Sequence, residues 1–265
     1  MGADKPVIDT SVPHSARIWN YWLGGKDNYP VDRQVGDQMI GVFPDIVASA
    51  RADRVFLGRA VRLLAGERGV DQFLDIGTGL PTVDNTHEVA QRANPASRIV
   101  YVDNDPLVLA HARALLTSAP EGETAYLDGD IHDPATILRE ASRTLDFSRP
   151  VGLTLLAIVQ FILDDQEAYA AVRTLMEALP PGSYLVLSHG TNEINTQASN
   201  AAVDYWNEHG TPPMVLRTAA QIAPFFDGLE ILDPGIVACS QWRPEANVFG
   251  DPVPVPHYCC VGLKP

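Results

Sequence analysis

Residues 72–79 read Gln-Phe-Leu-Asp-Ile-Gly-Thr-Gly, a short apolar run that ends in Asp75 and Ile76 and is followed by two glycines. A continuous apolar run indicates a strand that is covered on both faces. Gly77 and Gly79 can adopt positive φ, and without a Cβ they let a ligand approach the backbone. We predict a ligand-binding turn here. For an isolated Gly-x-Gly, a tight turn that binds nothing is the alternative.

Strand-like and helix-like segments alternate after this turn. This alternation is typical of βα units around a mostly parallel sheet. Strands are predicted at 72–76, 98–103, 124–130, 151–158 and 183–189. Helices are predicted at 86–94, 106–116, 134–145 and 166–179. Two apolar runs, at 229–234 and 256–265, predict an antiparallel pair that closes the sheet edge. The predicted fold is α/β, with a seven-stranded Rossmann-like sheet whose last strand is antiparallel.

The first 70 residues differ from the rest, because they show helical spacing around a loop at 24–30. We interpret residues 1–70 as a helical lid or extension and residues 71–265 as the sheet region of the same single domain. A further helix is expected at 195–209.

Composition excludes several classes of protein. The chain has 265 residues, and 33 Asp and Glu against 19 Lys and Arg give a formal net charge of -14 at pH 7. Proteins that hold phosphate backbones need clustered cations, so no nucleic-acid partner is expected. No window approaches the about 20 apolar residues of a membrane span, and the N-terminus lacks the apolar core of a secretion signal. We expect a cytoplasmic protein with no membrane partner.

The three cysteines, Cys239, Cys259 and Cys260, come late in the chain. Neighbours on a strand point to opposite faces, so the pair is not placed to bridge or to chelate an ion together. Neither a disulfide framework nor a metal site is predicted.

Three carboxylates lie at the carboxyl ends of the first three predicted strands: Asp75, Asp103 and Asp130. The carboxyl ends of parallel strands share one edge of the sheet, where ligands bind. Neighbouring carboxylates repel one another unless a cation or donor lies between them. A positively charged nucleoside fits this need. NAD(P) is the alternative, and Thr82 in the third position of the glycine run disfavours it.

Several motifs then point to a family. The runs DIGTG (75–79), YVDND (101–105) and LDGDIHD (127–133) resemble cofactor motifs of class I S-adenosylmethionine-dependent methyltransferases. More narrowly, PHSARIWNYWLGGKDNYPVDR (13–33), FLDIGTGLPT (73–82) and FFDGLEILDPGIV (225–237) resemble the actinobacterial S-adenosyl methyltransferase family that was once a domain of unknown function. The resemblance covers nearly the whole chain.

The resemblance implies that S-adenosylmethionine is the cofactor and assigns its ligands. It places the turn Asp75, Gly77, Thr78 and Gly79 around the methionine and ribose parts. Asp103 would hold the ribose hydroxyls. The adenine would lie against Asn104, Asp130 and Ile131, with Asp133 as a competitor. Leu156 and Ala157 would line the methyl group, and Gln160 stands where members commonly have a histidine.

The same resemblance favours a lid role for the N-terminal segment. Arg17 or Lys26 would reach the cofactor carboxylate, and Tyr21 would face the methyl group. The predicted acceptor-binding residues are Trp22, Asn28, Tyr29, Tyr205 and Trp206. An amphipathic helix that merely docks its aromatic side chains is the alternative.

A general base is needed only if the acceptor must lose a proton. The candidates are His14, His189, Glu193, Glu208 and His209. His189 and Glu193 are favoured because they follow the fifth strand at the ligand edge. Structural roles are expected for His87, His111, His132 and His257.

The predicted activity is methyl transfer from S-adenosylmethionine to a small molecule, such as an aromatic, indole or amine compound of secondary metabolism. The assembly could be a homodimer. A non-catalytic cofactor-binding protein and, less favoured, an NAD(P) oxidoreductase are the alternatives.

Overall fold

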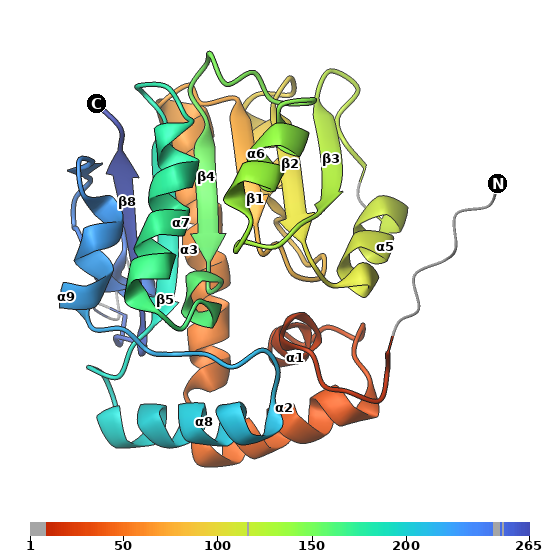
Figure 1. Ribbon diagram of the computed structural model, residues 1–265, viewed down its shortest axis with the longest axis vertical. Helices are drawn as coiled ribbons and strands as arrows, with labels where there is room; N and C mark the ends of the chain where they lie inside the picture. The colour runs from red at the N-terminus through yellow and green to blue at the C-terminus, as the bar shows by residue number, and fades with distance from the viewer. Residues whose placement is uncertain (1–8, 116, 246–249, 251) are drawn as a thin grey trace.

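The computed structural model describes residues 9–115, 117–245, 250 and 252–265 (Figure 1). A mixed sheet forms its centre. The strands are β1 (Gln72–Ile76), β2 (Arg98–Asp103), β3 (Glu123–Asp128), β4 (Gly152–Leu156), β5 (Tyr184–Gly190), β6 (Glu230–Ile231), β7 (Val237–Ala238) and β8 (His257–Leu263). The order is β3-β2-β1-β4-β5-β8-β6, and β7 also pairs with β8.

Strands β1 to β5 pair in parallel, whereas β8 runs antiparallel to β5, β6 and β7. The predicted sheet with an antiparallel last strand is therefore confirmed, and β7 is an addition from the Pro-rich connection. The strand order reverses between β1 and β4. Such a reversal opens a crevice at the carboxyl ends of the strands.

Two predicted strands end earlier than the sequence indicated. β3 ends at Asp128, so Asp130 lies in the loop beyond it. β4 ends at Leu156 because Ala157 has a φ of 51° and cannot continue the strand. Both loops lie at the carboxyl ends of the parallel strands, the edge of the sheet where ligands bind.

The helices match the predicted alternation, with one addition in the N-terminal segment. They are α1 (Ser15–Trp22), α2 (Pro30–Val42), α3 (Ile46–Glu67), α4 (Thr86–Ala93), α5 (Pro106–Leu115), α6 (Pro134–Ala141), α7 (Asp165–Glu177), α8 (Thr196–His209) and α9 (Ala219–Ile222). Short 3-10 turns are η1 (Val159–Phe161), η2 (Ala223–Phe226) and η3 (Cys239–Gln241). The added helix of the N-terminal segment is α2, and α9 is a second helix that was not predicted. Leu116, the predicted end of α5, and residues 1–8 lie outside the described residues.

Alternate residues of β1 serve two separate cores. Phe73 packs with α3 and α4 on one face of the sheet, and Leu74 packs with α6 and α7 on the other. Figure 1 shows α6 and α7 in front of the sheet and α3 behind it. Because side chains alternate along a strand, Asp75 points to the α3 side.

Helices α1, α2 and α8 lie beyond the carboxyl ends of the parallel strands (Figure 1). They share a third apolar cluster that includes Ile18, Trp22, Met39, Phe43 and Trp206. Helix α3 belongs in part to the sheet core, since Phe56, Leu57 and Val61 pack on it. The N-terminal segment therefore both covers the sheet face and closes over its edge.

The three cysteines are free and buried. Within the described part of the chain, no helix is long and apolar enough to cross a membrane.

Arg217 ties the C-terminal segment to the parallel strands. Its guanidinium donates to Asp165 Oδ1 at 2.8 Å, to the carbonyl of Ile162 at 2.8 Å and to that of Val159 at 3.2 Å. It also lies 2.9 Å from His189 Nε2, and the residue is only 1% exposed. Removal of this side chain would leave several buried acceptors without a donor.

We expect Arg217→Ala to lower the free energy of unfolding by about 2–6 kcal/mol, because the buried carbonyls of Val159 and Ile162 would each lose a donor at a cost of about 1–3 kcal/mol. Urea denaturation followed by circular dichroism measures it. Arg149→Ala, which removes an exposed pair with Asp71, should cost at most about 1 kcal/mol. Equal losses in the two variants would contradict the anchoring role of Arg217.

Candidate active site

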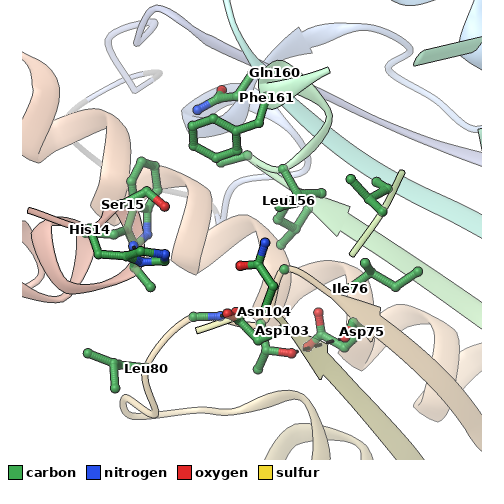
Figure 2. A pocket seen from close by; sticks show the side chains of 18 of the residues that line it. His14, Ser15, Asp75, Ile76, Leu80, Asp103, Asn104, Leu156, Gln160 and Phe161 are labelled. Atoms are coloured by element: carbon green, nitrogen blue, oxygen red, sulfur yellow. Dashed lines mark hydrogen bonds between the residues drawn. The ribbon is translucent and has the colours of Figure 1, made fainter. Parts of the chain in front are cut away.

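A cavity of about 190 Å³ lies at the carboxyl ends of β1, β2 and β4. Figure 2 shows its walls, with Asp75 and Asp103 on the sheet side and His14 and Ser15 approaching from the N-terminal segment. We call it the cofactor cavity. From the resemblance-based set, it is lined by Asp75, Gly77, Thr78, Gly79, Asp103, Asn104, Asp130, Ile131, Leu156, Ala157 and Gln160. The sheet topology thus brings these residues together.

The glycine turn needs both of its glycines. Gly77 has a φ of 75° and Gly79 a φ of 67°. A Cβ on Gly77 would come within 2.7 Å of Ile158, whereas a Cβ on Gly79 would meet only open space. Gly79 is therefore required for its backbone conformation, which side-chain-bearing residues rarely adopt. Thr78 donates its hydroxyl to the carbonyl of Asp75 at 3.1 Å.

Asp103 joins the glycine turn to the start of α5. Its carboxylate accepts the N–H of Gly79 at 2.8 Å and the N–H of Asp105 at 2.9 Å. Burial raises the pKa of Asp103 to about 6, although backbone hydrogen bonds from Asp105, Gly79 and Asn104 favour the charged form. A carboxylate has about four acceptor positions, so these donors leave room for a hydroxyl group in the cavity.

Asp75 is a buried carboxylate of the cavity lining. It accepts the hydroxyl of Thr86 at 2.5 Å, and burial raises its pKa. Arg54 of α3 lines the same cavity and interacts electrostatically with Asp75. Its guanidinium donates to the carbonyl of Val83 and to Asn85 Oδ1. Among the described residues, Arg54 is the only Lys or Arg that lines this cavity.

The loop after β3 forms the opposite end of the cavity. Asp130 is half-exposed, and its carboxylate lies 2.6 Å from His132 Nδ1 and 3.4 Å from Asn104 Nδ2. Burial raises the pKa of Asp130, but hydrogen bonds from His132 outweigh this effect and lower the pKa below its usual range. Ile131 is buried. Asp133 accepts the N–H of Thr136 as the N-cap of α6, and it does not line the cavity.

The predicted lid residues divide into those inside and those outside the cavity. Arg17 lies outside: its Nε is 3.6 Å from Asp32 Oδ1 and 3.8 Å from Asp105 Oδ2, and it is buried. Lys26 is exposed. His14 and Ser15 line the cavity instead. His14 Nδ1 lies 3.1 Å from Asp105 Oδ2, and burial lowers the pKa of His14.

Three predicted residues of this segment point to other partners. The hydroxyl of Tyr21 donates to Asp37 at 2.5 Å, which raises its pKa. Asn28 bonds to Asn20 and to the carbonyl of Gly25. Tyr29 packs against Leu80, Leu107 and Val108. None of the three lines a described cavity.

A second cavity of about 60 Å³ adjoins the first, and the two share Ser15, Trp19, Gln160 and Phe161 in their linings. We call it the apolar cavity. Two of the predicted acceptor-binding residues, Trp22 and Trp206, line it, whereas Tyr205 stacks on His209 elsewhere. Its described lining contains no Asp, Glu, Lys or Arg. The apolar cavity therefore lies next to the acidic cofactor cavity.

The favoured base candidates lie outside both cavities. His189 Nδ1 is 2.8 Å from the carbonyl of Gly190, and its Nε2 faces Arg217. Burial lowers the pKa of His189 to about 3, so the ring stays neutral with both nitrogens engaged. Glu193 accepts the N–H of Ala219 at 2.6 Å. Glu208 and His209 are exposed on α8. Of the five candidates, His14 alone lines the cofactor cavity.

The sequence interpretation gave no site role to four ionisable lining residues, Asp53, Arg54, His132 and His257. Asp53 and Arg54 lie about two turns inside a helix with ordinary apolar spacing, and His257 begins an apolar strand. For Asp53 and Arg54, the only signal in the sequence was a charged pair in the middle of an apolar helix. Their roles depend on how α3 and β8 pack against the strand ends.

The charged groups that line the cofactor cavity suit S-adenosylmethionine. The cavity offers carboxylates for an ammonium group and for ribose hydroxyls, and one guanidinium for a carboxylate. A dinucleotide needs a helix N-terminus facing its pyrophosphate, whereas here buried carboxylates stand at the glycine turn.

Comparison with known proteins agrees with this chemistry. A model of the S-adenosyl methyltransferase family matches residues 1–265. The chain is similar to a DUF574 family protein from Streptomyces avermitilis, with 48% identity, a TM-score of 0.93, and 98% of this chain and 100% of that one covered. It is similar also to a candidate methyltransferase from Thermobifida fusca, with 38% identity, a TM-score of 0.88, and 97% and 96% covered.

A more distant structure, a SAM-dependent methyltransferase from Anabaena variabilis, shares the fold alone, with 14% identity, a TM-score of 0.52, and 98% and 99% covered. None of the curated proteins matches the chain. The fold, the cofactor and the family predicted from the sequence are confirmed, and the cofactor is S-adenosylmethionine. The chain belongs to the S-adenosyl methyltransferase family.

Proposed function

We propose that the protein transfers the methyl group of S-adenosylmethionine to a small, uncharged aromatic molecule. The observation that carries the proposal is the apolar cavity, which is lined by Trp19, Trp22, Phe43, Phe161 and Trp206 and opens beside the cofactor cavity. A cavity without charged side chains disfavours charged acceptors, because each would lose its hydration without a partner. Aromatic walls favour flat apolar rings.

In this proposal each part of the cofactor has its own ligands. The ribose hydroxyls bond to Asp103, and the adenine lies between Asn104, Asp130 and Ile131. The amino group lies near Asp75. The cofactor supplies an electrophilic methyl group. The protein's task is to align it with the acceptor and to exclude water, and the shared wall of Ser15, Trp19, Gln160 and Phe161 supports such an alignment.

The ribose assignment predicts a pH dependence of binding. The folded-state pKa of Asp103 is raised to about 6, so the carboxylate is largely protonated at about pH 5 and ionised at about pH 7.5. Because the ionised form accepts ribose hydroxyls, the affinity for 5′-methylthioadenosine should rise with pH through a midpoint near 6. Calorimetry measures it. This ligand lacks the amino-acid part, so titration near Asp75 does not interfere.

The control is Asp103→Asn, which should bind about 10- to 150-fold more weakly at pH 7.5, as expected for a lost charged hydrogen bond of about 1.5–3 kcal/mol. Its affinity should not depend on pH over this range. Circular dichroism verifies that it folds. A wild-type affinity that is flat with pH would refute the ribose role.

We propose Arg54 as the ligand of the methionine carboxylate, in place of the earlier candidates Arg17 and Lys26. Arg54→Met should weaken binding of S-adenosylhomocysteine at least about tenfold and leave 5′-methylthioadenosine, which has no carboxylate, unaffected. Lys26→Met is the matched control and should change neither affinity. A selective loss in Lys26→Met would restore the original assignment.

The acceptor proposal is tested by filling the apolar cavity. Ala202 of α8 lines it and is 4% exposed, whereas the neighbouring Ala201 faces solvent. With S-adenosylhomocysteine bound, 2-naphthol or indole should raise the melting temperature of the wild type and of Ala201→Leu. Ala202→Leu should lose this response and keep its cofactor affinity. If no aromatic compound protects the wild type, the acceptor class is wrong.

The same proposal includes a role in actinobacterial secondary metabolism, a cytoplasmic location and a homodimer. Sedimentation of the purified protein tests whether it is a homodimer.

The competing function is a non-catalytic cofactor-binding protein. It predicts cofactor binding without formation of S-adenosylhomocysteine when 2-naphthol or indole is present.

A further inference from the structure

His257, the first residue of β8, stands at the boundary between the two cavities. It lines the apolar cavity and is 5% exposed. Its Nε2 lies 3.7 Å from Oδ1 of Asp53, a residue of α3 that is 4% exposed and lines the cofactor cavity. The ring of Trp19, which lines both cavities, lies 6.1 Å from the imidazole. The histidine and the carboxylate thus span the wall between the cavities.

Ser188 joins this pair to the methyl end of the cofactor cavity. Its Oγ lies 3.2 Å from His257 Nε2, bonds to Asp53, and accepts the N–H of Ala157 at 3.0 Å. Ala157 lines the cofactor cavity. With Nε2 facing Ser188 and Asp53, the neutral ring carries its proton on Nε2. Nδ1 then keeps its lone pair, and within the described part of the chain no hydrogen bond reaches it.

The charges around the ring favour a neutral imidazole before reaction. Burial lowers the pKa of His257, and Asp53 opposes this. Burial likewise raises the pKa of Asp53. The other facing groups are Cys239 of η3, whose thiol pKa is raised well above its usual value, and the neutral His189 of β5. Arg54 acts on Asp53 from the same helix.

We propose that His257 is the general base for methyl transfer to the hydroxyl group of a neutral aromatic acceptor, and that Asp53 is its positioning residue. The inference rests on the proposed function and narrows it to O-methylation. Among the described residues that line the apolar cavity, His257 is the only ionisable one. A phenol keeps its proton at neutral pH. A base that removes this proton makes the acceptor oxygen a stronger nucleophile.

The proton and the bonding electrons balance as follows. The acceptor oxygen forms a bond to the methyl carbon, and the carbon–sulfur bond breaks with its electron pair left on sulfur. The O–H proton passes to Nδ1 of His257. Asp53 offsets the charge of the resulting imidazolium, and the proton later leaves to water. One methyl ether, one thioether and one proton are the products.

The first test is spectroscopic and needs no turnover. 4-Nitrophenol, whose phenolate absorbs visible light, is bound to the protein loaded with S-adenosylhomocysteine. The wild type should stabilise the phenolate, whereas in His257→Gln the apolar cavity should raise the apparent pKa of the bound phenol by at least about one unit. 4-Nitroanisole, the methyl ether, has no proton to lose and should bind both proteins equally.

The outcomes separate the two proposals. If neither compound binds, the aromatic-acceptor function fails. If 4-nitroanisole binds but the phenolate signal is the same with and without His257, only the role of His257 fails. Loss of the signal in His14→Gln alone would transfer the role to His14, which lines the cofactor cavity.

The second test is kinetic, with labelled S-adenosylmethionine and 2-naphthol, which keeps its proton at neutral pH. His257→Gln should lower kcat by about 10²- to 10⁴-fold, the usual contribution of a general base, with little change in KM. Asp53→Asn should lower kcat less and shift the acid limb of the pH profile. Cys239→Ala, which removes a thiol 3.9 Å from Asp53, should leave both constants unchanged. One possible ligand atom each of Asp53, Cys239 and His257 lie within 4.8 Å of one another. Stoichiometric zinc in the purified protein that disappears in Cys239→Ala would therefore overturn the proposal.

Discussion

The local structure at the carboxyl ends of the parallel strands depends on the carboxylate of Asp103. It stands at the end of β2 and receives one backbone N–H from the glycine turn and one from the start of α5. Asp105, two residues on, then faces His14 and Arg17 of the N-terminal segment. Arg17 reaches Asp32 of α2. One buried acidic strand end thereby positions the turn, a helix start and the segment that closes the cavity.

This arrangement costs free energy when the cavity holds no cationic or donor-rich ligand. Burial raises the pKa of both Asp75 and Asp103, since their charged forms lose hydration. A ligand with an ammonium group and two hydroxyls relieves that cost. The same carboxylates, which add to the overall negative charge, are thus suited to a sulfonium nucleoside and poorly suited to phosphates.

The division into two cavities separates two kinds of binding. The cofactor cavity contains carboxylates and one guanidinium, whereas the lining of the apolar cavity carries no formally charged side chain among the described residues. In the proposed arrangement, the charged groups would bind the part of the cofactor that does not react. The reacting methyl group would lie at the shared wall, in surroundings of low polarity. Electrostatic effects on transfer are stronger there than in water.

The ligand edge was predictable because the parallel topology places every strand end on one side. Asp75, Asp103 and the glycine turn could therefore be placed at this edge from spacing and motif, and they line the cofactor cavity. The same logic favoured His189 as the base. His189 does end a strand, but β8 and Arg217 enclose it. His257, thought structural, reaches the apolar cavity because β8 runs antiparallel and brings its first residue to that edge.

The sequence by itself determined the family, the cofactor and the βα order, because these depend on local runs: apolar strands, glycines that permit positive φ, and acidic strand ends. Tertiary structure alone decided which cationic side chain lines the cofactor cavity. Arg17 and Lys26 lie in the distinctive N-terminal motif, yet Arg17 is buried against Asp32 and Asp105, and Arg54 lines the cavity. Side chains from distant helices meet only through packing, and no local pattern encodes such a meeting.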